Sequence, residues 1–238
     1  MVYYKSDDGR ILEQTDFSFD DYDISYVQCS HGDVIRGFYD GKSLGILLAD
    51  TMGHDKDTGE SFAKYLDENV RPSGWGTGEP SSELERLAET FPRDSDEELA
   101  SSLWRPVGAL MRLGCGKEQI AHAGIERPLY MKNDGSLEVV NGHGFLEYFH
   151  WLEHYPTQEK KMESGDMLMM YTDGVTDNMA KHGHDDPFDA LKVFLEHNRK
   201  SDAGFIASRM TDPGGFGYMM LPWDDMDDDI SLVLVKKK

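Results

Sequence analysis

Cysteine is scarce in this chain of 238 residues, which contains two, Cys29 and Cys115. Neither belongs to a C-x-x-C pair, so the sequence excludes a zinc ribbon and a disulfide framework. Long apolar runs are also missing, and the longest, at residues 44–49, is far too short to span a bilayer. Residues 1–10 carry charges and no apolar core, which argues against a signal peptide. We therefore expect a reduced, cytoplasmic protein.

Basic residues are few beside acidic ones, since 24 Lys and Arg against 45 Asp and Glu give a formal net charge of -21. Such a surface repels the phosphates of nucleic acids and of anionic lipids, so we expect neither nucleic acid nor a membrane as a partner. It suits metal cations and basic protein surfaces. Apolar residues make up 39% of the chain, which is enough to bury a sizeable core. The length suits one large domain, which we expect over residues 1–238.

The spacing of apolar residues changes along the chain and predicts a mixed fold. Asp-Gly at 40–41 and at 134–135 predicts the turns of two hairpins. Strands are predicted at residues 24–29, 34–38, 44–49, 107–113, 118–123, 129–132, 137–140, 167–171 and 230–235. Helices are predicted at residues 61–70, 80–91, 95–104, 187–198 and 206–210. The order of strands, helices, strands, helices and a last strand favours an α+β fold with helices layered on antiparallel sheets.

Three aspartates lie at the ends of apolar strands, with turn residues beside them: Asp50, Asp173 and Asp228. A single Asp-Gly step is ordinary turn chemistry. Three carboxylates at strand edges, if they share a cleft, would repel one another unless a divalent cation neutralised them. Hard oxygen ligands of this kind select Mg²⁺ or Mn²⁺ over Zn²⁺. The joint pattern therefore indicates a metal centre.

Five segments extend this pattern over residues 29–235. They are Gly-Asp at 32–33, ADTMGH at 49–54, AGIERPL at 123–129 followed by Asp-Gly at 134–135, GDMLMMYTDGV at 165–175 and DDISL at 228–232. Together, in this order, they resemble the motifs of the PPM-type metal-dependent protein serine/threonine phosphatases. The bacterial stage II sporulation protein E (SpoIIE-like) branch of that family is the nearer match.

The resemblance implies an α+β fold of two stacked antiparallel β-sheets flanked by helices, an α-β-β-α sandwich, with two Mn²⁺ or Mg²⁺ ions at the sheet edge. It implies that Asp50 bridges both ions and that the backbone carbonyl of Thr51 binds one of them. Asp173 and Asp228 would hold the other ion. Asp33 would contribute to metal binding indirectly, through ordered water. The catalytic role of Asp50, Asp173 and Asp228 would be exerted through a metal-activated water, so no protein nucleophile is needed.

The chain departs from the family at three positions. Arg36 stands where the family often has a second acidic residue. Its guanidinium would either bind the substrate phosphate through two parallel hydrogen bonds, or Arg36 would be an ordinary surface residue. Ile125 replaces a histidine of the family. Asp55 follows His54 where the family has a small residue. These changes bear on activity and substrate and leave the three aspartates in place.

The resemblance implies a signalling enzyme, a protein serine/threonine phosphatase. Its substrate would be a phosphorylated regulatory protein, such as an anti-sigma antagonist or a stress-signalling partner. One alternative is a catalytically weak binding module of the same fold that sequesters a partner. Another is a zinc peptidase, because residues 150–154 read H-x-x-E-H. The helical region at 55–104 follows Asp50 directly and would act either as a switch or as plain scaffold.

Overall fold

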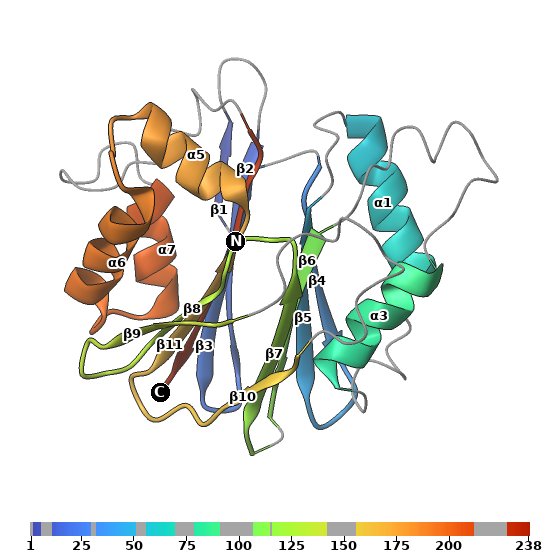
Figure 1. The fold of residues 1–238 in the computed structure, drawn as a ribbon, viewed down its shortest axis with the longest axis horizontal. Coiled ribbons are helices and arrows are strands. Elements are labelled where there is room, and N and C mark those ends of the chain that lie inside the picture. Colours follow the sequence, from blue (N-terminus) through green and yellow to red (C-terminus); the bar gives the residue numbers. More distant parts are fainter. Residues whose placement is uncertain are drawn as a thin grey trace. The chain divides into compact units, whose positions relative to one another are not determined.

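The computed structural model describes residues 2–5, 11–29, 32–50, 56–69, 79–90, 107–114, 116–141, 156–211 and 228–238. The chain divides into two compact units (Figure 1). The first unit contains residues 1–30, 128–140 and 162–238, and the second contains residues 31–127 and 141–161. The single domain expected from the sequence stays a prediction.

The first unit is built on a seven-stranded antiparallel sheet with the order β1-β2-β3-β12-β11-β8-β9. Its central strand, β12, is buried on both faces except at its last residue, as its nearly continuous apolar sequence predicts. The strands are β1 (Val2–Lys5), β2 (Ile11–Phe19), β3 (Tyr22–Cys29), β8 (Leu129–Met131), β9 (Leu137–Val139), β11 (Met167–Tyr171) and β12 (Ile230–Lys237).

Three helices pack on this sheet: α5 (Asp173–Lys181), α6 (Pro187–Asn198) and α7 (Ala203–Thr211). Helix α6 begins where Asp186 accepts a hydrogen bond from the backbone N–H of Asp189 at 3.0 Å, with proline at the first helical position. Apolar side chains of the three helices and of alternate positions on β11 and β12 form one core cluster. This core fixes α5 and α7 against the sheet.

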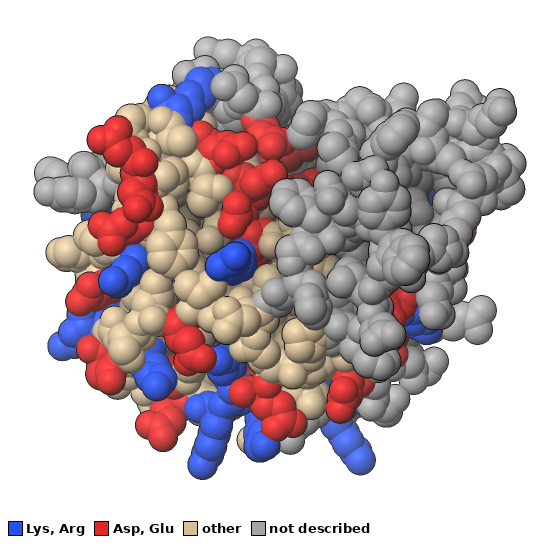
Figure 2. Space-filling view, in the orientation of Figure 1, with Lys and Arg blue, Asp and Glu red and all other residues tan. Residues whose placement is uncertain are grey.

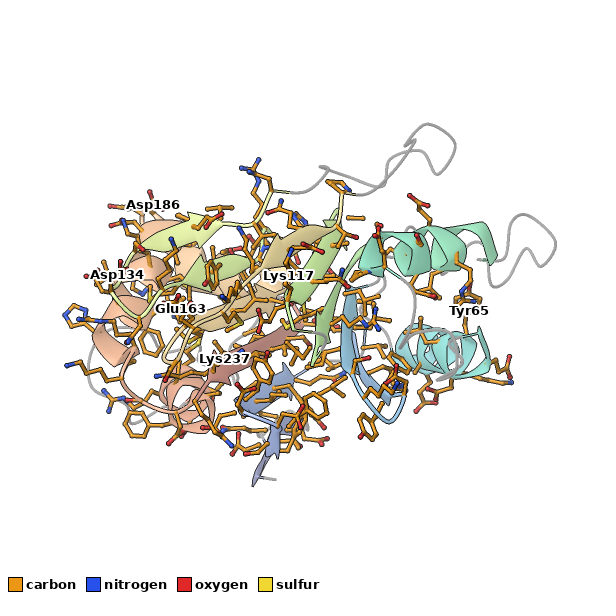
Figure 3. The ribbon with its side chains drawn as sticks, turned by 90° about the horizontal axis from the view of Figure 1, so that it is seen from below. Tyr65, Lys117, Asp134, Glu163, Asp186 and Lys237 are labelled. Atoms are coloured by element: carbon orange, nitrogen blue, oxygen red, sulfur yellow. The ribbon has the colours of Figure 1, made fainter. Side chains whose placement is uncertain are left out.

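The second unit is built on a five-stranded antiparallel sheet with the order β10-β7-β6-β5-β4. Its elements are β4 (Val34–Tyr39), β5 (Leu44–Asp50), α1 (Lys56–Asn69), α3 (Pro80–Thr90), β6 (Val107–Leu113), β7 (Glu118–Ala123) and β10 (Gln158–Lys160). Leu66 of α1 and Leu84 of α3 join the core with Leu47 and Leu110 of the sheet. The hydroxyl of Tyr65 (Figure 3) donates to the backbone carbonyl of Leu87 at 3.1 Å and ties the two helices together.

The α+β class with two antiparallel sheets flanked by helices is confirmed. The strands at 107–113, 118–123 and 167–171 and the helix at 187–198 have the predicted bounds. Both predicted hairpins are present, as β4–β5 and β8–β9. The helix expected at 95–104 lies outside the described residues. Among the described residues, no helix combines the length and hydropathy needed to span a bilayer.

Strands β1, β2 and β10 were not predicted from the sequence, and the prediction for the segment after β11 was wrong. Strand β2 reads ILEQTDFSF, and its polar positions hide the alternation that marks a strand. Asp173-Gly174 was expected to form a turn, but both residues lie in the first turn of α5. Helix α1 also starts earlier than predicted, at Lys56. Polar helix starts and polar strands give little periodic signal.

Candidate metal centre

The pairing of β11 with β12 brings two of the predicted metal aspartates to one edge of the sheet. Tyr171, the last residue of β11, pairs with Leu232. Because the two strands are antiparallel, the residues just after β11 must lie beside the residues just before β12. Asp173 is the first residue of α5, and Asp228 lies just before β12. The register therefore places both aspartates at the same end of the strand pair.

Thr172 forms two hydrogen bonds across the junction between α5 and β12. Its backbone N–H donates to the carbonyl of Ser231 at 3.0 Å, and its Oγ1 accepts from the backbone N–H of Ser231 at 3.0 Å. Thr172 and Ser231 are both fully buried. Thr172 is the N-cap residue of α5, and its backbone is extended, with φ at -90° and ψ at 162°. The start of α5 is thus tied to the start of β12 by backbone and side chain together.

Gly174 allows the helix to approach the strand closely. A Cβ added at Gly174 would meet the carbonyl oxygen of Asp229 at 1.9 Å. No side chain fits at that separation, so glycine is required at this position. Next to it, Asp228 Oδ1 accepts a hydrogen bond from the backbone N–H of Asp229 at 2.7 Å, which orients the Asp228 carboxylate.

The outcome is a cluster of three carboxylates. Asp173, Asp177 and Asp228 each offer one oxygen, and these oxygens all lie within 4.8 Å of one another. Asp177 follows Asp173 by four residues on α5, so the two side chains share a helix face. Asp228 joins them from the strand side. Figure 2 shows acidic side chains gathered over the start of α5 and over the connection from α5 to α6.

Asp177 was not predicted as a ligand from the sequence. The signal that reveals it is the four-residue spacing from Asp173, which has meaning only on a helix. Since the segment was interpreted as a turn, that spacing carried no information. Asp173 and Asp228 were predicted as ligands of the same ion, and the structure brings their carboxylates together.

The electrostatics of the cluster suit a cation. Burial raises the pKa of the Asp177 carboxyl, and the negative charge of Asp173 raises it further. Negative charge is therefore costly at this place without a counter-charge. Three carboxylate oxygens within 4.8 Å form a hard donor set, which matches Mg²⁺ or Mn²⁺. The residues present fit a divalent cation.

The second unit places two further predicted residues next to each other. Val34 pairs with Ala49 in the β4–β5 ladder, so Asp33, just before β4, and Asp50, the last residue of β5, lie at the same edge of that sheet. Asp33 is 3% exposed, and Asp50 is half-buried. Thr51 lies outside the described residues. The predicted metal-binding roles of Asp33, Asp50 and Thr51 stay predictions.

Arg36 contacts helix α1. Its Nε donates to Asp67 Oδ1 at 2.8 Å, and one of its terminal nitrogens donates to the backbone carbonyl of Ile35 at 3.1 Å. The guanidinium therefore has a protein partner, and its predicted role in binding substrate stays a prediction. Ile125, which replaces a histidine of the family, is buried. The H-x-x-E-H segment at 150–154 lies outside the described residues.

Solved structures show which fold this arrangement belongs to. The RsbU and RsbW domains of a Mycobacterium tuberculosis protein match with a TM-score of 0.65 and 17% identity, over 91% of this chain and 61% of that one. The PP2C phosphatase domain of Bacillus subtilis SpoIIE, solved with a fragment of its regulatory domain, matches with a TM-score of 0.65 and 12% identity, over 94% of this chain and 64% of that one. RsbX in complex with magnesium matches with a TM-score of 0.63 and 12% identity, over 95% of this chain and 100% of that one.

This chain spans less than two thirds of the first two structures. At these identities the likeness shows the fold, which is that of the PP2C-type (PPM) phosphatases. A search of curated protein sequences gave no significant match. The model of the family described as "Stage II sporulation protein E (SpoIIE)" matches residues 40–238. Since that match covers most of the chain and extends over both units, the chain belongs to the stage II sporulation protein E (SpoIIE) family.

Proposed function

We propose that this chain is a metal-dependent phosphatase that hydrolyses phosphoserine or phosphothreonine in a regulatory protein. The observation that carries the proposal is the carboxylate cluster of Asp173, Asp177 and Asp228 at the junction of α5 and β12. Membership of the SpoIIE family and the fold of a PP2C phosphatase domain support it. We further propose that both units together form the single phosphatase domain expected from the sequence.

The proposed cofactor is Mn²⁺ or Mg²⁺, with two ions in all. Asp173, Asp177 and Asp228 would hold one ion, and Asp50, the carbonyl of Thr51 and Asp33 would hold the other. Divalent cations of this kind neutralise phosphoryl oxygens and lower the pKa of water, so water becomes a nucleophile near neutral pH. The bound magnesium of RsbX, which has the same fold, supports this choice. Asp50 as the ligand shared by both ions stays a prediction.

The chain's own contribution is to keep repelling carboxylates in place. The backbone of Asp173 is held beside Asp228, because Thr172 is hydrogen-bonded to Ser231 and Gly174 lies against Asp229. Such rigid support favours cation binding over rearrangement, since the ligands need little reorganisation when the ion arrives. Thr172 and Gly174 are positioning residues in this account.

The proposed substrate is a regulatory phosphoprotein. One of the similar structures is the PP2C phosphatase domain of SpoIIE, which is described as a cell-fate determinant and carries a regulatory domain, and this supports a regulatory substrate. The net charge of -21 favours basic patches on a protein substrate over nucleic acid or anionic lipid. The alternative is a catalytically weak binding module, which would have the same fold as the phosphatase but would hydrolyse little or no phosphate ester.

Hydrolysis of p-nitrophenyl phosphate separates these functions. We expect turnover with Mn²⁺ or Mg²⁺ and none with EDTA. Asp173→Asn should reduce turnover at least about a hundredfold, as expected when a metal ligand is lost. Asp185→Asn, an exposed aspartate outside the cluster, should leave turnover unchanged.

Each other outcome points to a different function. Absence of turnover with every divalent metal, on the aryl phosphate and on phosphoserine proteins, would favour the binding module. Zinc-dependent cleavage of casein that survives Asp173→Asn would favour the peptidase. Phosphatase activity that persists in EDTA would contradict the proposed chemistry.

A further inference from the structure

Helix α5 carries a buried side-chain amide, that of Asn178, beside the carboxylate cluster. Asn178 is 4% exposed, although asparagine is usually found at the surface or at a helix end. Its backbone carbonyl accepts a hydrogen bond from the N–H of His182 at 3.1 Å. Within the described part of the chain, neither Nδ2 nor Oδ1 of its side chain has a hydrogen-bond partner. No other buried side chain among the described residues leaves two polar atoms in this state.

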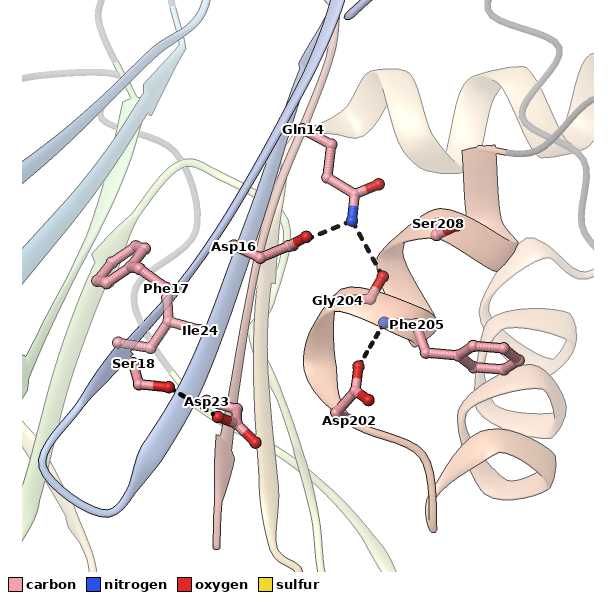
Figure 4. A pocket seen from close by; sticks show the side chains of 10 residues that line it. All are labelled: Gln14, Asp16, Phe17, Ser18, Asp23, Ile24, Asp202, Gly204, Phe205 and Ser208. Atoms are coloured by element: carbon pink, nitrogen blue, oxygen red, sulfur yellow. Dashed lines mark hydrogen bonds between the residues drawn. The ribbon is translucent and has the colours of Figure 1, made fainter. Parts of the chain in front are cut away.

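Two other amides of the first unit show the ordinary situation. Gln14 on β2 is 3% exposed, and its Nε2 donates to Asp16 Oδ1 and to the backbone carbonyl of Gly204, both at 3.0 Å (Figure 4). Asn198, at the end of α6, donates to the backbone carbonyl four residues before it at 2.8 Å. Burying an amide without replacing its hydrogen bonds to water destabilises a fold. Asn178 therefore weakens the fold unless a ligand completes its hydrogen bonds.

Asn178 lies at the boundary between the carboxylate face and the core face of α5. Asp177 precedes it directly, whereas Met179 after it belongs to the apolar core cluster. Helical side chains lean toward the preceding turn, which for Asn178 is the turn of Gly174. Gly174 lies against the backbone just after Asp228. The amide is therefore on the side of α5 that meets the segment carrying Asp228.

Water is the ligand that matches an amide beside three carboxylates. A water molecule can donate to Oδ1 and accept from Nδ2, whereas a cation would engage only Oδ1 and an anion only Nδ2. An anion would also be repelled by Asp173, Asp177 and Asp228. Mg²⁺ and Mn²⁺ keep part of their hydration shell in such sites, since three carboxylate oxygens fill only about half of an octahedron. That water needs hydrogen-bond partners in the protein.

We propose that Asn178 is a positioning residue of the metal centre, and that its amide holds water of the hydration shell of the cation at Asp173, Asp177 and Asp228. This inference rests on the proposed metal-dependent phosphatase and adds a residue to it. The amide stabilises the cation-bound chain and destabilises the cation-free chain. Its removal should therefore raise the stability of the cation-free chain and lower the affinity for cations, a combination that a purely structural role does not predict.

Asn178→Leu replaces the amide by two methyl groups with the same branching. In EDTA its melting temperature should exceed that of the natural chain by about 2–4 °C, because an unpaired amide is gone. Its dissociation constant for Mn²⁺, titrated by electron paramagnetic resonance, should rise at least about tenfold. The matched control Gln14→Met removes an amide that has protein partners. Its melting temperature should fall, and its affinity for Mn²⁺ should stay that of the natural chain.

Nuclear magnetic resonance of the natural chain tests the same contact without a variant, so the test stands even if Asn178→Leu folds poorly. The Nδ2 protons of Asn178 should shift when Mg²⁺ is added, and those of Asn198, which already have a backbone partner, should not. Bound Mg²⁺ that leaves the Asn178 signals in place would overturn the inference. So would a lower melting temperature of Asn178→Leu together with unchanged Mn²⁺ affinity. Either result would leave the proposed phosphatase standing, whereas a natural chain that binds neither cation would overturn both.

Discussion

The α-carbon of Gly174 lies so close to Asp229 that a Cβ on Gly174 would come within 1.9 Å of the Asp229 carbonyl oxygen. This contact sets the distance between the first turn of α5 and the segment that enters β12. The contact therefore helps to decide where the carboxylates of Asp173 and Asp228 lie.

Gly174→Ala should displace α5 from β12. Forced overpacking of this kind typically costs about 1–3 kcal/mol of unfolding free energy. We expect a loss in that range in urea unfolding, together with weaker Mn²⁺ binding. The matched control is Gly37→Ala, because a Cβ there would meet nothing nearer than Leu44 Cδ1 at 4.0 Å. If both variants unfolded alike and bound Mn²⁺ like the natural chain, the close contact would have no role.

Asp177→Asn should separate charge repulsion from cation binding. Asn keeps the shape of the side chain and removes one negative charge from the cluster, so the metal-free protein should gain a few tenths of a kcal/mol. The rise in melting temperature on addition of Mn²⁺ should shrink, since a ligand of the native state is lost. Differential scanning fluorimetry with Mn²⁺ and with EDTA measures both effects, with Asp185→Asn as the control. A full Mn²⁺-dependent rise in the Asp177→Asn variant would remove Asp177 from the metal site.

Asp67→Ala tests the role assigned to Arg36. The ion pair at 2.8 Å is partly exposed, so its loss should cost less than about 1 kcal/mol. If Arg36 binds the substrate phosphate, Asp67→Ala should free its guanidinium and lower KM for p-nitrophenyl phosphate, whereas Arg36→Ala should raise KM. Steady-state kinetics would show KM unchanged in both variants if Arg36 only holds α1.

Asp40 should make the β4–β5 hairpin sensitive to acid. Backbone hydrogen bonds from Ser43, at 2.6 Å, and from Lys42, at 2.8 Å, hold the pKa of the Asp40 carboxyl below its ordinary value of 3.8. A depressed pKa stabilises the fold above the ordinary value, and this contribution is lost as the pH falls through the folded pKa. Asp40→Ala should therefore be less stable than the natural chain at pH 7, and the two should converge as the pH falls below 3.8.

The check is chemical denaturation of both chains across that pH range, with Lys42→Ala as an exposed control in the same turn. A stability difference that stayed constant down to the lowest pH would contradict the assigned cause. The hairpin matters for the site because Asp33 and Asp50 lie at its far end.

Apolar strands and their hairpins were predictable because burial on both faces produces continuous apolar runs, as in residues 44–49 and 167–171. The family motifs pointed to Asp173 and Asp228, and the β11–β12 register then explains why they meet. Asp177 was not predictable without knowing that α5 starts at Asp173. The need for glycine at 174 was likewise hidden, since it comes from a contact with residue 229, far away in sequence.

The proposed activity depends on divalent cation binding by Asp173, Asp177 and Asp228, and electron paramagnetic resonance of Mn²⁺ tests this most directly. The signal of free Mn²⁺ is titrated with the natural chain, with Asp228→Asn and with Asp185→Asn. We predict bound Mn²⁺ in the natural chain and in Asp185→Asn, and at least about tenfold weaker binding in Asp228→Asn. Equal Mn²⁺ binding by all three chains, or none by the natural chain, would contradict the proposed metal centre.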